Sequence, residues 1–94
     1  MESLNDKLER YEKLTAKALE IASIKGDLNL KERKIAEDFM SMAKNYYSDA
    51  KFFWQNGELE TALAAFSYAH AWLDAGVRAG LFDGKGNDRL FTLP

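Results

Sequence analysis

Two residues in the C-terminal third of the chain have the types and the spacing of a small reactive site. His70 and Asp74 are four residues apart, which places them on successive turns of one helix face. At this spacing a carboxylate can orient an imidazole for proton transfer, or both side chains can bind one metal ion. His70 is the single histidine and falls on the apolar side of its segment. The simpler interpretation is therefore a buried histidine that is hydrogen-bonded to Asp74 or to a tyrosine.

Asp49 is the other acidic residue that could join such a site. It borders the apolar stripe of the preceding segment, where we expect it to meet Arg78 or a tyrosine hydroxyl. A compact bundle of three helices leaves little room for a substrate pocket. A structural hydrogen bond or ion pair is therefore favoured over catalysis for Asp49.

The remaining polar motifs point away from catalysis. Glu37 and Asp38 lie among lysines and serines, as solvated charges do, and 84–86 (GKG) is too short to cradle a phosphate. The sequence thus predicts no catalytic residue, no metal site and no cofactor. The alternative is an enzyme, dependent on a metal or a small molecule, built around His70, Asp74 and Asp49.

Composition narrows the class of protein further. The 94 residues suffice for one domain, and 13 basic and 15 acidic residues leave a net charge of −2, with both signs interspersed. This balance disfavours nucleic acid as a partner. No run of apolar residues reaches the roughly 18 that a membrane span needs, the N-terminus is charged where a signal peptide is apolar, and cysteine is absent. We expect a cytoplasmic protein that does not bind membranes.

Apolar residues recur every three or four positions in three segments, a period typical of amphipathic helices. The expected helices span about 2–25, 30–56 and 58–79. The sequence therefore predicts an all-α fold, an up-down-up three-helix bundle over 1–80, followed by a turn and tail at 81–94 that pack on the bundle.

Local signals mark the ends of these helices. Gly26 is expected to cap the first helix in a left-handed conformation, Asn29 and Glu32 have the spacing of a capping box, and Gly57 marks the end of the second helix. The second helix has the widest apolar side, so we expect it to be central. Phe52 lies on its polar face, and the tail is a candidate to cover it.

The third helix has more apolar surface than one core face needs. Its core face is expected to centre on Phe66 and Leu73, yet the opposite arc is also apolar. The residues of that arc are Ala64, Ala65, Tyr68, Ala71, Trp72 and Ala75. Either the first helix and the tail cover this arc, or it contacts a protein partner or a second copy of the chain.

The segment 45–83 resembles a small archaeal family known as domain of unknown function 357. The similarity extends less distinctly over nearly the whole chain. Its strongest matching points are Tyr47, Asp49, Ala50, Phe53, Gly57, Ala62, Leu63, Ala69, 72–76 (WLDAG) and 80–82 (GLF). The resemblance implies a short up-and-down helical bundle in an archaeal cytoplasm. It implies no activity and provides no catalytic residues.

The segment 45–79 also resembles half of a tetratricopeptide repeat, with Gly57, Ala62, Phe66 and Ala69 at the matching positions. The proline usual after the second helix of that repeat is missing. The resemblance favours a protein-binding helical hairpin over an enzyme. Together these features predict a non-catalytic interaction or self-association module that uses the outer arc of the third helix.

Overall fold

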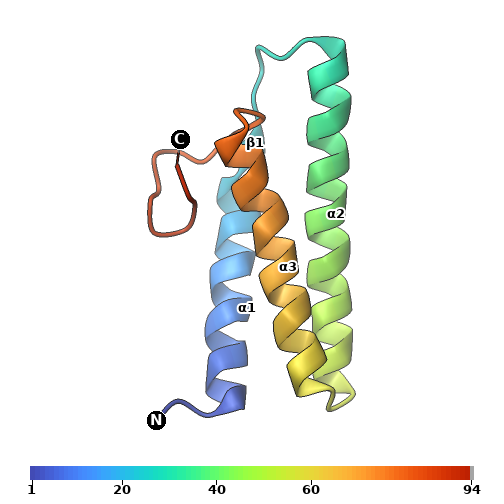
Figure 1. Cartoon of the computed structure of the whole chain (residues 1–94), viewed down its shortest axis with the longest axis vertical. Coiled ribbons are helices and arrows are strands. Elements are labelled where there is room, and N and C mark those ends of the chain that lie inside the picture. The colour runs from blue at the N-terminus through green and yellow to red at the C-terminus, as the bar shows by residue number, and fades with distance from the viewer. Residues whose placement is uncertain (94) are drawn as a thin grey trace.

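The structure, a computed structural model, describes residues 1–93 and is a three-helix bundle of 43 × 23 × 16 Å. Its elements are α1 (Leu4–Ile21), β1 (Ser23–Ile24), α2 (Leu30–Gln55), α3 (Leu59–Arg78) and β2 (Phe82–Asp83). The helices run up, down and up (Figure 1). The predicted all-α class and the up-down-up order are confirmed.

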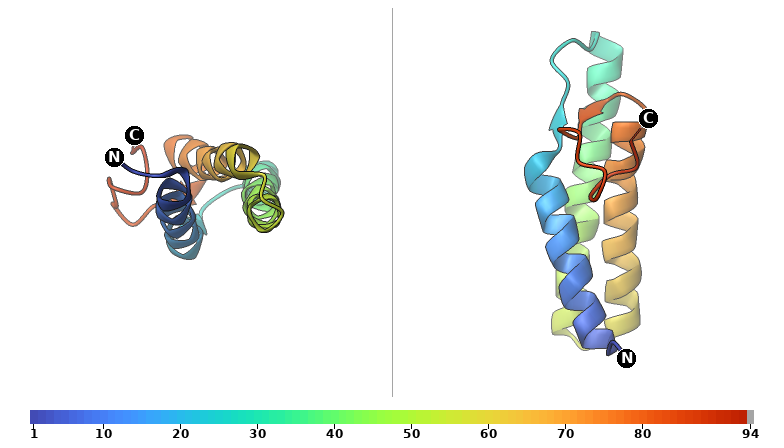
Figure 2. Two further views of the ribbon diagram at one scale, coloured as in Figure 1. Left: turned by 90° about the horizontal axis from the view of Figure 1, so that it is seen from below. Right: turned by 90° about the vertical axis from the view of Figure 1, so that its left-hand side faces the viewer.

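Helix α3 is the central member of the bundle. It lies between α1 and α2, and each outer helix contacts it more extensively than the two contact each other (Figure 2). The prediction that the second helix is central was wrong. The width of its apolar side does not determine which helix is central. Small residues on several sides of α3 let both neighbouring helices approach closely, among them Ala62, Ala65, Ala69 and Gly76.

Both ends of α2 form as the sequence predicts, and α3 ends in the same way as α2. Asn29 accepts a hydrogen bond from the Glu32 amide at 2.8 Å, and the Glu32 carboxylate accepts from the Asn29 amide at 2.9 Å, which completes the capping box. Gly57 and Gly80 follow α2 and α3 with φ of 79° and 78°, in the left-handed region that glycine adopts without strain.

Helix α1 ends at Ile21, four residues earlier than predicted, and Gly26 does not cap it. The chain turns extended at Ala22, because Ser23 and Ile24 pair antiparallel with Asp83 and Phe82. This pairing is long-range, so the helical period around Ile24 could not reveal it. A pair of two-residue strands is not stable alone and needs an anchor in the core.

That anchor is Phe82, which is 1% exposed and lies against α3 at Gly76. A Cβ atom at Gly76 would be 2.2 Å from two carbons of the phenyl ring. Only glycine leaves space for the ring at this position. Around Phe82, buried Ala22, Leu73 and Phe91 form the upper part of the core.

The lower part of the core is built around Phe66, with Leu8 of α1 and Ala50 of α2. Here α1 and α2 are also joined directly. The hydroxyl of Tyr47 donates to the Glu12 carboxylate at 2.6 Å. Burial and the adjacent carboxylate raise the pKa of Tyr47 to about 12.

We predict that Gly76→Ala destabilises the protein by roughly 1–3 kcal/mol. The new methyl group forces Phe82 out of its position, and the cost of this displacement exceeds the gain in helix propensity from alanine. Chemical denaturation measures the change. Gly26→Ala is the matched control, since nothing lies within 4 Å of a Cβ there. Equal stabilities for the two variants would show that Phe82 does not depend on this contact.

The Tyr47–Glu12 pair predicts a loss of stability at alkaline pH. In the unfolded chain the phenol ionises near pH 10, about the ordinary tyrosine value. Between about pH 10 and about 12 the folded state therefore keeps a proton that the unfolded state has released, and the free energy of unfolding falls as pH rises. For Tyr47→Phe, the free energy of unfolding measured by urea denaturation should fall less across this pH range than it does for the wild type. Parallel plots of this free energy against pH for the two proteins would contradict the raised pKa of Tyr47 as the cause.

Candidate functional site

His70 is held by the C-terminal tail and by α1. Its Nε2 lies 2.6 Å from the carbonyl oxygen of Leu90, to which it donates, and its Nδ1 lies 3.3 Å from the hydroxyl of Thr15. The expected partners, Asp74 or a tyrosine, are not the ones found. Both ring nitrogens have a partner, so the imidazole is a packing residue between α1, α3 and the tail.

Asp74 and Arg78 continue the same row along α3. The Asp74 carboxylate accepts from the Thr92 amide at 2.9 Å, and the Arg78 guanidinium donates to the Leu93 carbonyl. With His70, three side chains at four-residue spacing therefore bind the backbone of the tail. Phe91 of the tail is 3% exposed.

This row explains where the tail lies. The tail runs beside α1 and α3 (Figure 2), and Phe52 on α2 remains 59% exposed. The candidate contact between the tail and Phe52 was wrong, because the polar partners of the tail backbone lie on α3. The four-residue spacing correctly predicted that His70 and Asp74 lie on one face of α3. It did not predict that both bind the backbone of the tail.

Asp49 is not brought together with His70. It is exposed on α2 and lines a hollow on the far side of α3 from Thr15 and the tail. Among residues 1–93, no three His, Cys, Asp or Glu side chains are arranged to hold a metal ion. The three residues of the enzymatic alternative therefore do not form one site, because His70 and Asp74 contact the tail and Asp49 lines the hollow between α2 and α3.

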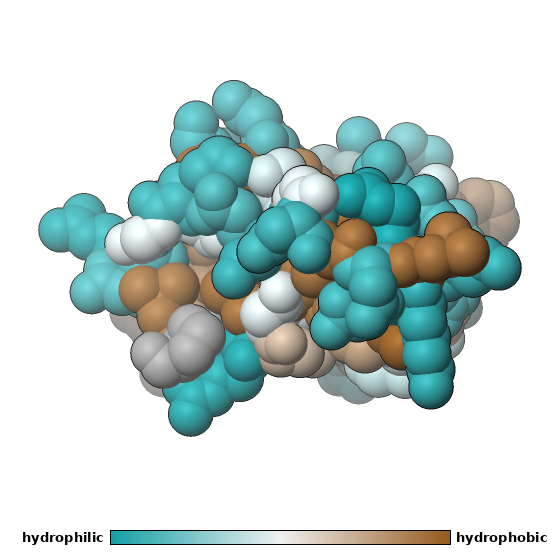
Figure 3. Space-filling view, turned by 90° about the horizontal axis from the view of Figure 1, so that it is seen from above, coloured by the Kyte–Doolittle hydropathy of each residue, from teal (hydrophilic) through white to brown (hydrophobic). Residues whose placement is uncertain are grey.

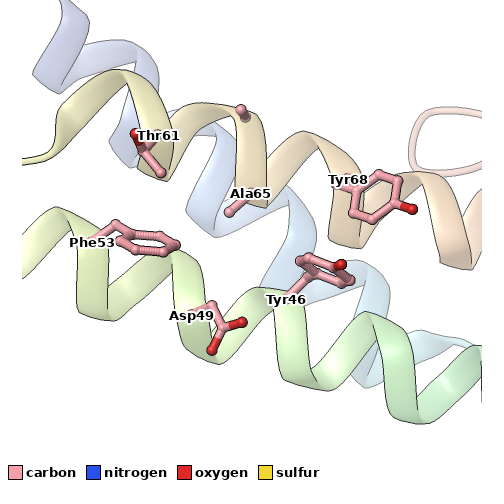
Figure 4. Close-up of a pocket in the computed structure, with 7 residues that line it drawn as sticks. Tyr46, Asp49, Phe53, Thr61, Ala65 and Tyr68 are labelled. Carbon is pink, nitrogen blue, oxygen red and sulfur yellow. The ribbon is translucent and has the colours of Figure 1, made fainter.

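The hollow beside Asp49 is the lower part of a groove between α2 and α3. It has a volume of about 440 Å³, and its walls are mainly apolar. Side chains from both helices face it (Figure 4). The lining residues are Tyr46, Asp49 and Phe53 on α2 with Thr61, Ala64, Ala65 and Tyr68 on α3.

Past Tyr68 the groove continues into an upper hollow of about 230 Å³ that is lined by α3 residues: Tyr68, Ala71, Trp72 and Ala75. The ring of Tyr68 forms a ridge between the two hollows. It packs edge-on against Tyr46, with ring centres 4.5 Å apart, and against Trp72 at 6.1 Å. We call the two hollows with their ridge the α2–α3 groove.

Two thirds of α1, all of α2 and α3 and the first tail residues match a known family. The family described as "Protein of unknown function (DUF357)" matches residues 10–82. The chain belongs to the DUF357 family. No curated protein and no solved structure matches the chain. The DUF357 match includes all of the residues that line the α2–α3 groove, but it stops at Phe82 and so leaves out the part of the tail that binds His70.

The structure leaves four of the six predicted interaction residues of this DUF357 chain exposed: Ala64, Tyr68, Ala71 and Ala75. Tyr68 is 48% exposed. The prediction that Ala65 belongs to the open arc was wrong, because α3 is central and its contact with α2 extends over this residue, which is 8% exposed.

Trp72 is half-buried and is covered on one side by α2. Its ring packs edge-on against Phe39 with centres 5.0 Å apart. The indole Nε1 is buried and has no hydrogen-bond partner within the described part of the chain. Trp72 therefore forms the floor of the upper hollow, and Tyr68 is the more exposed aromatic residue of the two on this face of α3 in the DUF357 bundle.

The α2 wall of the groove was missed, although the sequence contains a signal for it. Phe39, Tyr46 and Phe53 are separated by seven residues each, the repeat of a helix that packs along a parallel or antiparallel neighbour. Their place on the apolar side of the second helix indicated the core of the chain itself. In the structure Tyr46 and Phe53 line the lower hollow, with Phe53 also against the lower core, whereas Phe39 packs on the upper core and against Trp72.

The end of the molecule where α2 begins has a mixed surface. Hydrophobic residues there are interrupted by hydrophilic ones (Figure 3). None of the helices formed by the described residues is long and apolar enough to cross a bilayer.

Burial predicts different effects of the same substitution at the two aromatic residues of the groove. Trp72→Glu should lower the free energy of unfolding by about 2–4 kcal/mol, because it places a carboxylate against Phe39. Tyr68→Glu should cost less than about 1 kcal/mol in dilute protein, since the side chain reaches solvent. Urea denaturation measures both. A larger loss for Tyr68→Glu would mean that Tyr68 is part of the core.

Proposed function

We propose that the protein is a non-catalytic interaction module whose α2–α3 groove accepts a helix, from a protein partner or from a second copy of the chain. One observation carries this proposal. The exposed side chains along α3 beside the groove recur at alternating steps of three and four residues: Thr61, Ala64, Tyr68, Ala71 and Ala75. This is the seam by which one helix packs along another.

The chemistry of the groove also favours a helix over a small molecule. Alanine side chains allow a second helix axis to come close, and Tyr68 supplies a large, rigid ring with a polar end. Asp49 is the one ionisable carboxylate that lines either hollow. The two shallow hollows extend along about four turns of α3, a length that fits an elongated apolar ligand.

The enzymatic alternative has less support. His70 and Asp74 bind the tail backbone, and Asp49 lies on the other side of α3. The similarity of 45–79 to a tetratricopeptide hairpin agrees with a role in protein binding. The setting that we propose, an archaeal cytoplasm without nucleic acid or membrane as a partner, rests on the family resemblance and the charge balance.

Site-specific photo-crosslinking in cells of the source organism tests this function. A photoreactive residue at Ser67, on the rim of the seam, should produce a defined adduct that mass spectrometry identifies, and Tyr68→Glu in the same chain should abolish it. The same photoreactive residue at Ser48, an exposed serine of α2, is the matched control. No adduct at Ser67, or one that forms equally from Ser48 or survives Tyr68→Glu, would contradict helix docking in the groove.

A further inference from the structure

We infer that the helix that fills the α2–α3 groove is α3 of a second copy, antiparallel to the first, in a dimer with twofold symmetry. This inference rests on the proposed function and names the partner of the same groove. The surface that carries it is complementary to itself in shape and in charge.

The shape argument follows from the register of the seam. When two copies of α3 pair antiparallel with their centres between Ala69 and His70, Ala64 faces Ala75 of the second copy and Tyr68 faces Ala71 of the second copy. Each large residue then opposes a small one. The Tyr68 ring of either chain enters the upper hollow of the other, which Ala71 and Ala75 line.

The charge argument selects the same orientation. Arg78 lies in the last turn of α3, which contains no other arginine and no lysine, and Glu60 lies in the first turn. In the antiparallel register Arg78 of the second copy is level with Thr61, between Glu60 on α3 and Asp49 on α2. A parallel pair would instead place equal charges side by side.

Arg78 can make these contacts while it keeps its place at the tail. One of its guanidinium nitrogens donates to Leu93, and the group has five N–H donors in all. The twofold axis repeats the arrangement at both ends of the seam. Antiparallel helix dipoles add a further favourable contribution.

Disulfide trapping tests the register, because the chain contains no cysteine of its own. Ala64 and Ala75 are exposed, so cysteines there leave the core intact. A mixture of the single variants Ala64→Cys and Ala75→Cys should form a disulfide-linked dimer under mild oxidation. Each variant alone is the matched control: equivalent residues are about 16 Å apart along the axis, beyond disulfide reach.

Sedimentation equilibrium supplies the second measurement. The wild type should sediment at twice the 10.7 kDa chain mass at high micromolar concentration, and Tyr68→Glu should sediment as a folded monomer. Arg78→Glu should weaken the dimer at least tenfold, and Glu60→Arg in the same chain should restore it.

Three results would overturn the inference. They are a monomeric wild type in sedimentation, a disulfide between two copies of the same single-cysteine variant, and a dimer that persists in Tyr68→Glu. The photo-crosslinking result separates such a failure from failure of the proposed function. An adduct from Ser67 to another protein, with a wild-type monomer in sedimentation, would retain the helix-docking groove and reject the second copy as its occupant.

Discussion

The upper half of the molecule depends on the contact between the Phe82 ring and Gly76. The ring can lie directly on the α3 backbone because Gly76 has no side chain. This contact fixes β2, and β2 in turn pairs with β1 and draws the chain out of α1 after Ile21. A two-stranded pair of this length has no stability of its own, so its position follows from the burial of one aromatic ring.

The same preference for small residues explains why α3 is central. Ala62, Ala69 and Gly76 bring α1 and α2 close to its axis, and a helix packed so tightly on two sides needs little bulk there. The consequence is that a third side of α3, with Ala64, Ala71 and Ala75, is also apolar but has no neighbour. The groove is therefore a product of the packing that stabilises the fold.

Sequence patterns predicted the features that depend on neighbouring residues. The capping box at Asn29, the helix end at Gly57 and the period of α3 act within a few residues, and each is present. The wrong predictions concern residues whose environment is set by distant parts of the chain. Gly26 does not cap α1 because β2 pairs near it, and Ala65 is buried because α2 crosses α3 there. A helical wheel has no information about which neighbour lies on which side.

The two long sides of α3 differ in the kind of contact that they can make, and this difference bears on function. Toward α1, side chains with hydrogen-bonding groups, His70, Asp74 and Arg78, bind the backbone of an extended segment, which is how a helix holds a peptide without regular structure. On the open side beside α2, the exposed seam offers alanines and one tyrosine. Such a surface cannot satisfy the backbone of an extended segment, which would lose its hydrogen bonds to water on binding. A helix satisfies its own backbone internally and presents only side chains, so the open side of α3 is suited to a helix.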